Sequence, residues 1–455
     1  MPERESVGAR PSPPVKPPGW FDRLLEHVPV HLAATQTGRR AALVVGGNVT
    51  NKALVFLIQM VLIRTMAKAE FALFSVVVMT LEVVTELADL GLNVNLVRNY
   101  SRYAERDRNR ALSVVWLILR VKVLWVFFLT IVFYLLAPHF ALLLHKPEMS
   151  DFLRLAAIGL AAPVMIYFAL SHLQAVQWFG RYILINIFER AGLLVLISIL
   201  ALTGSLWLFS AVTVWIFFPY VAAILALALT PRDYDRIKRI EPGVGSEVFH
   251  FGKWALLSNL LTLIMLRLDV FMLTALSTEE QVADFVVAVR LAALAQVASA
   301  GLSTALLPRV GRFVSVGECR AYMRNVWKLA PVLALGAALV CLVARPVMTI
   351  PFGAKVSTAV PLFRLVLAGE VMWLFLVPPA LLLYRFNRVD LICLTNALML
   401  IVSAIANGVL IPRLGGTGAA VAYVLARGVA MVSVLITASY CLRRGSGLDK
   451  LAQKN

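Results

Sequence analysis

Basic side chains interrupt the long apolar runs of this chain, at depths where a charge is expensive. Six of them lie within runs long enough to cross a membrane: Lys52, Arg120, Lys122, Arg267, Arg290 and Arg427. A charge at the centre of a bilayer costs about 2.5–3.5 kcal/mol on insertion scales, so such residues face protein or water and mark a substrate or ion pathway. Because guanidinium and ammonium groups bind phosphates well, we predict that these six contact an anion such as a pyrophosphate, with Arg120 and Lys122 at the inner mouth.

Uncharged polar residues accompany these cations. Three share a helix face with Lys52 in the first apolar run, and a fourth follows Arg290 at a comparable depth: Asn48, Asn51, Gln59 and Gln296. A polar stripe of this kind faces protein or water and not lipid. We therefore expect these side chains to line a central hydrated cavity with excess positive charge.

Three acids lie one helical turn or two apart in the second apolar run. The i, i+4, i+7 spacing of Glu82, Glu86 and Asp89 places them on one face of a helix. That face is the obvious partner for Lys52, and Asp269 is a fourth acid at depth. We expect these carboxylates to form ion pairs with the basic residues or to carry coupling protons. The alternative is that all of these charges form structural ion pairs that lock the helices together.

The elements that hold these residues are membrane helices. The chain has 455 residues, of which 60% are hydrophobic and only 15% charged, and its mean hydropathy is +0.83. Soluble domains are about half apolar and a quarter charged. Long apolar runs recur throughout, so the sequence predicts an all-α, polytopic membrane protein and not a globular enzyme with one anchor.

About twelve runs are each near the roughly 20 residues that a transmembrane helix needs. We place them at 43–65, 71–96, 112–136, 152–176, 182–203, 206–229, 254–276, 283–306, 329–350, 361–384, 389–411 and 417–441. The loops between them alternate in charge. Most of the 43 basic residues fall in one set of loops, whereas the alternate loops hold only Lys68, Lys146, Arg345, Lys355 and Arg413. The positive-inside rule then places both termini in the cytoplasm of a multi-pass plasma membrane protein.

The longest inner loop and a weak internal repeat divide the chain into two six-helix halves around a central cavity. A shift of 210 residues lays 91–103 over 301–313, and Gly91 then meets Gly301. We predict a flexible, Pro-rich cytoplasmic tail over 1–42, an N-terminal half over 43–229, a cytoplasmic linker over 230–253, a C-terminal half over 254–441 and a tail over 442–455. A parallel repeat of this kind implies a pseudo-two-fold axis along the membrane normal.

Several classes of function are disfavoured. The net charge of +18 follows from the loop asymmetry and does not indicate a nucleic-acid partner. The four cysteines and six histidines show no metal-ligand or disulfide spacing, and no GxxxxGK[ST] phosphate loop occurs, so we expect no metal, no cofactor and no ATP site. The expected outer loops are too short for a catalytic domain, which disfavours a membrane-embedded glycan ligase or polymerase. We therefore expect that the protein is not an enzyme.

The first two apolar runs resemble a known family. The segments GGNVTNKALVFLIQMVLIRTMAKAEFALFSVVV and LADLGLNVNLVRNYSRY are similar to the oligosaccharide flippase or polysaccharide transporter family, within the multidrug/oligosaccharidyl-lipid/polysaccharide exporter superfamily. The matching positions are Gly47–Asn48, Leu62, Arg64, Glu70–Phe71, Phe74, Ala88–Leu92 and Leu96–Arg98. The close match covers about sixty residues; twelve helices in two halves extend it over the chain.

The resemblance implies a function. Members of this family are bacterial inner-membrane proteins that move undecaprenyl-pyrophosphate-linked oligosaccharide to the outer leaflet by alternating access of two halves. The implied partners are the lipid-linked oligosaccharide, membrane lipid, and the polymerase and glycosyltransferases of exopolysaccharide, capsule or O-antigen synthesis. An ion gradient, the membrane potential or product removal would drive transport.

Two alternatives come from the same superfamily. Multidrug antiporters have a similar length and helix number but bind cationic drugs with cavity carboxylates; Lys52 disfavours this alternative, whereas the acids of the second run keep it open. A flippase of the lipid II type is the weaker alternative, because such proteins usually have more helices.

Overall fold

The chain folds entirely into helices in the part that this computed structural model describes. The structure describes residues 36–89, 91–104, 107–231, 267–296, 315–386 and 388–444, with a few single residues and short pieces between 241 and 313. Every regular element in those ranges is an α-helix or a 3-10 helix, which confirms the predicted all-α class. The expected tail over 1–42 and linker over 230–253 lie mostly outside the described residues.

The N-terminal group of helices precedes residue 230 and the C-terminal group follows it. The first group is α2 (Gln36–Thr65), α3 (Lys68–Asp89), α4 (Leu92–Tyr103), α5 (Arg108–Leu143), η1 (Pro147–Met149), α6 (Ser150–Gly159), α7 (Ala161–Ala175), α8 (Phe179–Leu202) and α9 (Leu208–Leu229). The second is α11 (Glu279–Ala292), α13 (Val316–Leu342), α14 (Ala344–Phe352), η3 (Ala354–Ala359), α15 (Val360–Arg385), α16 (Val389–Leu414) and α17 (Gly416–Arg444). Residues 267–276, ahead of α11, are also helical.

The described helices agree with the predicted membrane spans. Nine of them are long and apolar enough to cross a membrane, and a bent pair makes a tenth in the described part of the chain. All ten coincide with predicted runs. The two other predicted runs, 254–276 and 283–306, lie partly outside the described residues, so the number twelve stays a prediction. The protein is a multi-pass membrane protein.

One predicted span is divided at a glycine. The run expected over 71–96 forms α3, which ends at Asp89, and α4, which begins at Leu92. Gly91 between them has φ 68° and ψ 13°, in the left-handed region that side chains disfavour. The Asp89 carboxylate accepts a hydrogen bond from the backbone N–H of Asn93 at 3.3 Å, which satisfies one of the free donors of the new helix.

Two further predicted spans are broken ahead of a proline. The run over 152–176 divides into α6 and α7 after Gly159, and the run over 329–350 bends by 57° between α13 and α14. Pro163 and Pro346 have no N–H for the carbonyls four residues earlier, at Gly159 and Leu342. The loss of that hydrogen bond explains why each helix is interrupted there.

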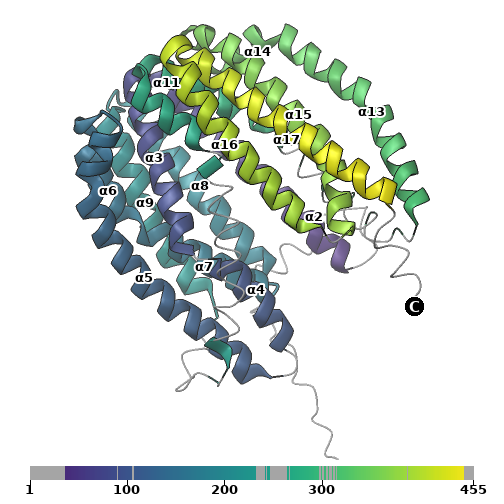
Figure 1. Cartoon of the computed structure of the whole chain (residues 1–455). Coiled ribbons are helices and arrows are strands. Elements are labelled where there is room, and N and C mark those ends of the chain that lie inside the picture. Colours follow the sequence, from purple (N-terminus) through teal and green to yellow (C-terminus); the bar gives the residue numbers. More distant parts are fainter. Residues whose placement is uncertain are drawn as a thin grey trace, which may run out of the picture.

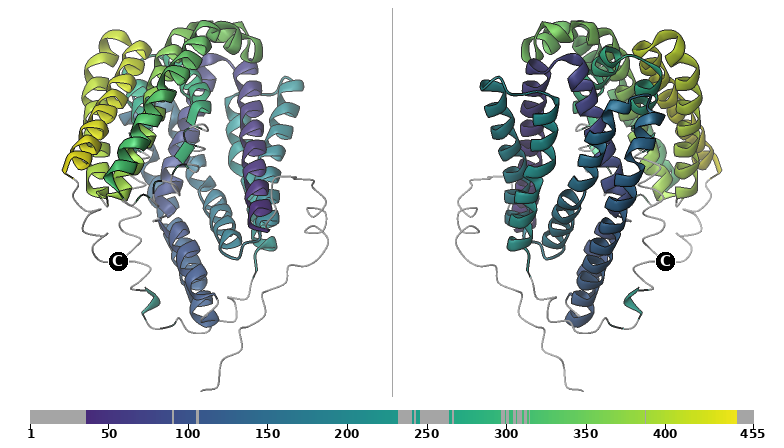
Figure 2. Two further views of the ribbon diagram at one scale, coloured as in Figure 1. Left: turned by 90° about the vertical axis from the view of Figure 1, so that its right-hand side faces the viewer. Right: turned by 90° about the vertical axis from the view of Figure 1, so that its left-hand side faces the viewer.

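The two groups of helices meet at one end and diverge toward the other. Figure 1 shows α11 and α14 at the upper end, where the groups approach, and α4 at the lower end. Figure 2 shows the lower end from two sides, with α5 extending below the other helices. At the upper end α11 packs against α3 and α14 against α2, so both contacts join the two groups.

Polar contacts between the groups gather at this upper end. Lys68 Nζ forms an ion pair with Asp284 at 2.9 Å and donates to Thr358 at 2.6 Å, and Lys146 Nζ pairs with Glu279 at 2.6 Å. We call these two ion pairs the end contacts, together with the contacts that the side chains of His145 and Lys355 make with backbone carbonyls, described next.

Two of the end contacts repeat each other. His145 Nδ1 lies 3.1 Å from the Ala275 carbonyl, and Lys355 Nζ lies 3.3 Å from the Arg64 carbonyl and 3.5 Å from the Met66 carbonyl. Lys355 follows His145 by 210 residues, and Ala275 follows Thr65 by the same number. Thr65 lies between Arg64 and Met66, so the shift that aligns the two copies of the sequence repeat relates these two contacts to within one residue, which agrees with a pseudo-two-fold arrangement.

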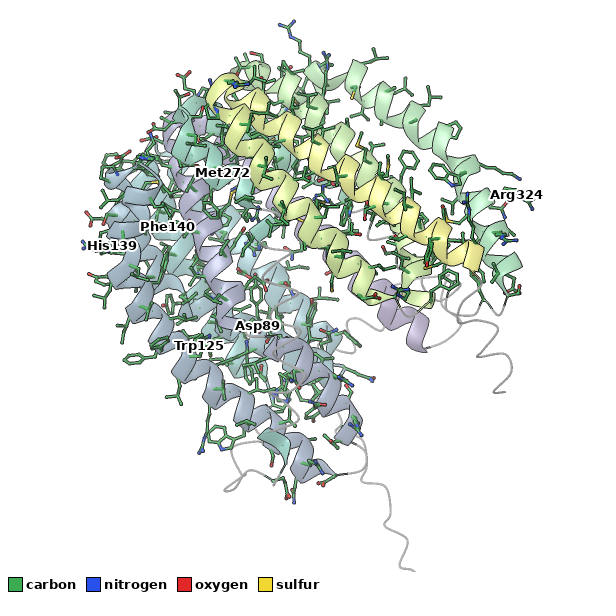
Figure 3. All side chains as sticks on the ribbon, in the orientation of Figure 1. Asp89, Trp125, His139, Phe140, Met272 and Arg324 are labelled. Carbon is green, nitrogen blue, oxygen red and sulfur yellow. The ribbon has the colours of Figure 1, made fainter. Side chains whose placement is uncertain are left out.

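Apolar side chains cover the outside as well as the core. Phe127, Leu124 and Ile224 each expose about 70% of their surface (69%, 71% and 70%). A soluble protein rarely exposes large apolar side chains so densely, whereas a bilayer accepts them. Figure 3 shows how densely side chains fill the space between the helices, with Asp89 at the end of α3 and Trp125 of α5 beside it.

Candidate functional site

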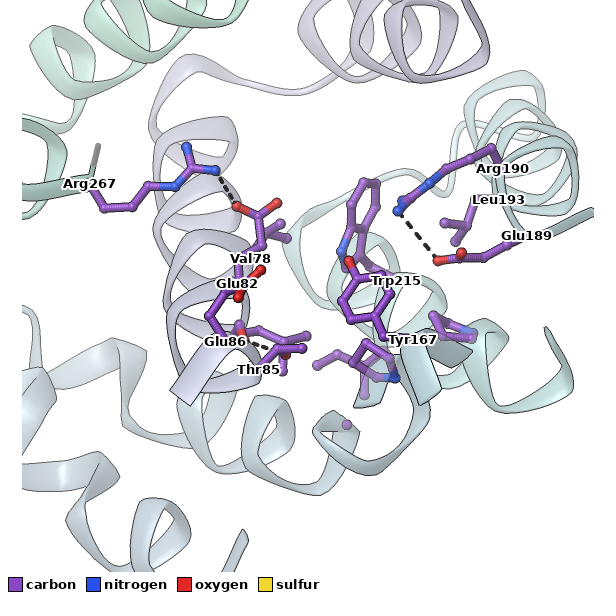
Figure 4. A pocket seen from close by; sticks show the side chains of 15 residues that line it. Val78, Glu82, Thr85, Glu86, Tyr167, Glu189, Arg190, Leu193, Trp215 and Arg267 are labelled. Atoms are coloured by element: carbon purple, nitrogen blue, oxygen red, sulfur yellow. Dashed lines mark hydrogen bonds and ion pairs between the residues drawn. The ribbon is translucent and has the colours of Figure 1, made fainter. Parts of the chain in front are cut away.

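A cavity lies among the helices of the N-terminal group and reaches the C-terminal group. It encloses about 200 Å³ and is lined from α3, α6, α7, α8 and α9, with Arg267 as its contribution from the second group. Figure 4 shows Glu82 and Glu86 on one wall and Glu189 and Arg190 on the opposite wall. We call this space the N-terminal cavity.

The α3 wall of the N-terminal cavity carries two carboxylates. Glu82 forms an ion pair with Arg267 at 2.5 Å, and this pair joins the two groups of helices. Glu86, one turn further along α3, lines the cavity as well. Within the described part of the chain, the Glu86 carboxylate makes no hydrogen bond and no ion pair; Figure 4 shows it beside the paired Glu82. Glu82 and Glu86 face the same space, whereas Asp89, the third acid of the predicted face, pairs with Lys122 and does not line this cavity.

The opposite wall combines an ion pair with two aromatic rings. Glu189 of α8 is buried and lies 3.5 Å from the Arg190 guanidinium. Tyr167 of α7 is 38% exposed although it lies inside the bundle, because it faces the cavity. Trp215 of α9 stands beside it, and Figure 4 shows both rings in the centre of the view. The cavity thus has aromatic surfaces between charged walls.

Three carboxylates and two guanidiniums line the N-terminal cavity: Glu82, Glu86, Glu189, Arg190 and Arg267. With Glu82 and Glu189 each paired to an arginine, Glu86 is the carboxylate in excess. These five lining charges are therefore acidic on balance, and Lys122 is close enough to Glu86 to act on it electrostatically.

A second group of charges lies beside the first, between the two groups of helices. Arg290 of α11 donates to the Gln59 side chain of α2, and its guanidinium lies 5.6 Å from the centre of the Phe71 ring. Glu82 and Arg267 are both close enough to act on Arg290 electrostatically. Two guanidiniums thus share one carboxylate here. We call Gln59, Glu82, Arg267 and Arg290 the central cluster; its net charge is positive.

Lys122 is fully buried against an acid. Its Nζ lies 2.6 Å from Asp89, with none of the side chain exposed. The predicted partner of the α3 acids was Lys52, but the structure pairs Asp89 with Lys122 of α5. Trp125, one turn further along α5, donates to the Leu87 carbonyl at 3.3 Å and fastens α5 to the same end of α3.

Arg427 is enclosed by the C-terminal helices. Its guanidinium donates to Tyr423 at 2.9 Å, lies 3.7 Å from Glu370 and covers the Trp373 ring at 4.3 Å. Gln296 donates to the same Glu370 carboxylate at 2.9 Å. Arg427 and Glu370 are 4% and 1% exposed, so this arrangement has the properties of an internal ion pair.

Asp269 is buried in a separate polar contact of the same group. Its Oδ1 accepts from Ser403 at 2.9 Å and from the Asn407 amide at 2.5 Å. Both partners lie on α16, so this contact ties the helical residues 267–276 to α16. Asp269 and Arg427 are near enough to interact electrostatically.

The remaining predicted residues lie near the outside of the described structure. Asn48 and Lys52 of α2 are exposed, and Asn51 is half-buried with its Oδ1 buried and unpartnered. Arg120 is exposed on α5, where its guanidinium stacks 4.4 Å above the Trp116 ring. The structure therefore brings Gln59, Arg267 and Arg290 together and leaves Lys52 and Arg120 outside that cluster.

Two lining residues were not predicted from the sequence. Tyr167 and Trp215 stand in apolar runs where an aromatic residue is ordinary, so no signal distinguished them. Glu189 and Arg190 were visible as charges at depth, but adjacent residues point to different helix faces, which left their partners undefined. Among the described residues, no group of three His, Cys, Asp or Glu side chains is placed to hold a metal ion.

Comparison with family models finds one described as "Polysaccharide biosynthesis protein", which matches residues 38–314. The match includes α2 to α11, and hence the whole N-terminal cavity and the central cluster. A comparison with curated proteins finds no match.

Solved structures with the same fold are transporters and a flippase. An inward-facing multidrug resistance MATE family transporter of the MOP superfamily aligns with a TM-score of 0.74 at 16% identity, over 87% of this chain and 96% of that one. The lipid II flippase MurJ, in an inward closed conformation, aligns at 0.67 and 11% identity, over 87% of each chain. An outward-facing MATE family transporter aligns at 0.61 and 16% identity, over 92% and 98%. At these identities the likeness shows the fold.

Proposed function

Because the chain belongs to the polysaccharide biosynthesis protein family, we propose that it moves a lipid-linked oligosaccharide across the membrane. The match over residues 38–314 is the observation that carries this proposal. The substrate would be an undecaprenyl-pyrophosphate-linked oligosaccharide, and the membrane the bacterial inner membrane. The product would serve exopolysaccharide, capsule or O-antigen synthesis, beside the polymerase and glycosyltransferases of that route.

The positive charge of the central cluster supports binding of the pyrophosphate. Arg267 and Arg290 come from the C-terminal group and reach Glu82 and Gln59 of the N-terminal group. Guanidinium groups bind phosphate oxygens in pairs, and a dianion would replace Glu82 as their partner. An anion bound there touches both groups of helices, which is what a substrate must do if it is to bias their relative position.

The shape of the structure supports alternating access. The end contacts close one end, and the arginines of α4 and of the start of α5 belong to the other end, which the positive-inside rule assigns to the cytoplasm. The TM-score of 0.74 to the inward-facing transporter exceeds the 0.61 to the outward-facing one. We infer an inward-open state, with both termini cytoplasmic, from which the substrate headgroup enters while the lipid tail stays in the bilayer.

A second candidate is export of an organic cation. The excess carboxylate of Glu86, beside the rings of Tyr167 and Trp215, would suit a cationic ligand. Drug resistance on overexpression, with no polysaccharide defect when the gene is deleted, would favour this candidate.

The flippase proposal is tested by the loss of Arg290. In a deletion strain, Arg290→Ala should abolish surface polysaccharide and leave lipid-linked intermediate on the inner leaflet, with protein levels unchanged. Lys52→Ala is measured in the same assay, because Lys52 belongs to the six predicted anion contacts but lies outside the central cluster. Arg345→Ala, an exposed arginine of α14, is the matched control and should retain polysaccharide. Normal polysaccharide with Arg290→Ala would exclude the central cluster as the pyrophosphate site.

A further inference from the structure

We propose that the N-terminal cavity is a sugar subsite, which holds the ring next to the pyrophosphate and selects a neutral or amino sugar against a uronic acid. This inference rests on the proposed function and adds the class of glycan that the site accepts. It is carried by the cavity's volume, its lining and its position beside the central cluster.

The volume of the cavity suits one sugar ring. Its volume is about 200 Å³. A pyranose ring with its substituents is of this size, whereas a whole oligosaccharide is not. The cavity would therefore hold one residue of the glycan and leave the rest outside.

The lining offers what a sugar ring requires on its faces and edges. Tyr167 and Trp215 supply flat apolar surfaces, and the axial C–H groups of a pyranose form an apolar face that packs on such rings. A carboxylate accepts hydrogen bonds on both of its oxygens and so binds hydroxyl or ammonium groups at the ring edge. Glu86 is placed to do this, because no described side chain occupies its carboxylate.

The position of the cavity matches the order of groups in the substrate. In a polyprenyl-pyrophosphate glycan the first sugar is bonded directly to the pyrophosphate. Here the Glu82–Arg267 pair, at 2.5 Å, belongs to both the N-terminal cavity and the central cluster. A pyrophosphate held by Arg267 and Arg290 would thus place its attached sugar at the entrance of the cavity.

The charge of the cavity predicts its selectivity. Three carboxylates against two guanidiniums give a net negative lining. A uronic acid would bring a second carboxylate toward Glu86, and like charges at close range are a means of rejecting a wrong ligand. An amino sugar would instead gain a charge-assisted hydrogen bond.

The test measures binding of simple glycosides to the full-length protein in lipid nanodiscs. The probes are the methyl glycosides of glucosamine, glucose and glucuronic acid, titrated by saturation-transfer NMR. We expect the tightest binding for the glucosaminide, weaker binding for the glucoside and the weakest for the glucuronide. Glu86→Gln should weaken glucosaminide binding about tenfold, the effect of one hydrogen bond to a charged group, and should reduce the discrimination against glucuronide.

Two further variants keep the test decisive. Glu148→Gln, which removes an exposed carboxylate in η1 outside the cavity, should leave all three affinities unchanged. If Glu86→Gln does not fold, Glu86→Asp retains the charge but withdraws it by one methylene, and should lower the glucosaminide affinity while keeping the order of the three glycosides. Equal or tighter binding of the glucuronide, no effect of Glu86, or no glycoside binding at all would overturn the sugar subsite.

The failure of this inference can be told apart from failure of the proposed function. If Arg290→Ala abolishes surface polysaccharide but the glycosides show no order of affinity, the flippase stands and the subsite falls. If the glycosides do not bind, tetraphenylphosphonium binds in a Glu86-dependent manner and Arg290→Ala retains polysaccharide, both proposals fall in favour of cation export.

Discussion

Lys122 shows how the partner of a charged residue decides what that residue can do. An ammonium group with no exposed surface cannot bind a substrate without leaving Asp89, from which it lies 2.6 Å away. Removing one partner of a buried ion pair is costly because the other remains buried without compensation. Lys122, predicted at the inner mouth of a cavity, therefore has a strong structural role in this conformation.

Loss of Lys122 alone should destabilise the protein more than loss of the pair. We expect Lys122→Met to lower the free energy of unfolding by about 3–5 kcal/mol, because Asp89 is left unpaired. Adding Asp89→Asn should restore most of this stability, since asparagine keeps the acceptor for the Asn93 N–H without the charge. Thermal denaturation in detergent would measure both. A double variant no more stable than the single one would contradict the pairing.

For single residues, the sequence predicts which charged side chains lie within membrane helices, but not which of them contact each other. The periodicity of Glu82 and Glu86 correctly predicted a shared face, because spacing within one helix is fixed by geometry. Their partners, Arg267 and Lys122, depend on how separate helices pack, which one sequence does not reveal. Arg427 was predicted to contact substrate, yet it is enclosed by Glu370, Tyr423 and Trp373, so its role in binding stays a prediction that this conformation does not support.

Among the helices, the break between α3 and α4 is the one that a single residue controls. Gly91 allows the chain to leave α3 in the left-handed region and to begin α4 two residues after Asp89. Both flanking helices carry contacts of the interior, since Asp89 pairs with Lys122 and Leu92 is buried in the α4–α5 core. A substitution at Gly91 would therefore disturb the contacts of both α3 and α4.

Substitution of Gly91 by alanine should destabilise the protein, whereas the same substitution at Gly428 should not. Gly91→Ala should destabilise the protein by about 1–2 kcal/mol, the cost of a left-handed conformation for a residue with a Cβ. Gly428→Ala in α17 is the control, because a Cβ there meets nothing within 4 Å and alanine favours a helix. Chemical denaturation of the two variants side by side gives the comparison. Equal stabilities would show that α3 and α4 can adjust around residue 91.

Helix positions were well predicted because the length of an apolar run is a property of the sequence itself. The run expected at 182–203 is α8, Phe179–Leu202, and that at 206–229 is α9, Leu208–Leu229. The breaks within the predicted membrane spans were less well predicted. Prolines are common in membrane helices, and only packing decides whether the backbone bends, as at Pro163, or continues, as at Pro219 within α9.

For the molecule as a whole, the end contacts determine which side is closed. The two ion pairs among them join α3 to α11 and the segment after α5 to α11, and Lys68 of α3 also contacts η3. If the protein alternates between two conformations, these contacts must break in the other one. Weakening them should then favour opening at that end.

Reversal of one charge in an end contact should open that end, and reversal of both should close it again. Lys146→Glu places two acids together at Glu279 and should increase labelling of a cysteine introduced at Ala283, a buried residue of α11, by an impermeant thiol reagent. Lys146→Glu with Glu279→Lys should restore the original labelling. Labelling that is the same in all three proteins would show that this ion pair does not control access.

The partial exposure of the end contacts has a consequence for ionic strength. The side chains of Lys68 and Asp284 are 27% and 14% exposed, and those of Lys146 and Glu279 are 19% and 27% exposed. Mobile ions screen such pairs: the Debye length falls from about 10 Å at 0.1 M salt to about 3 Å at 1 M. Salt on the closed side would therefore weaken these pairs, so the ionic strength on that side of the membrane would shift the balance between the two conformations.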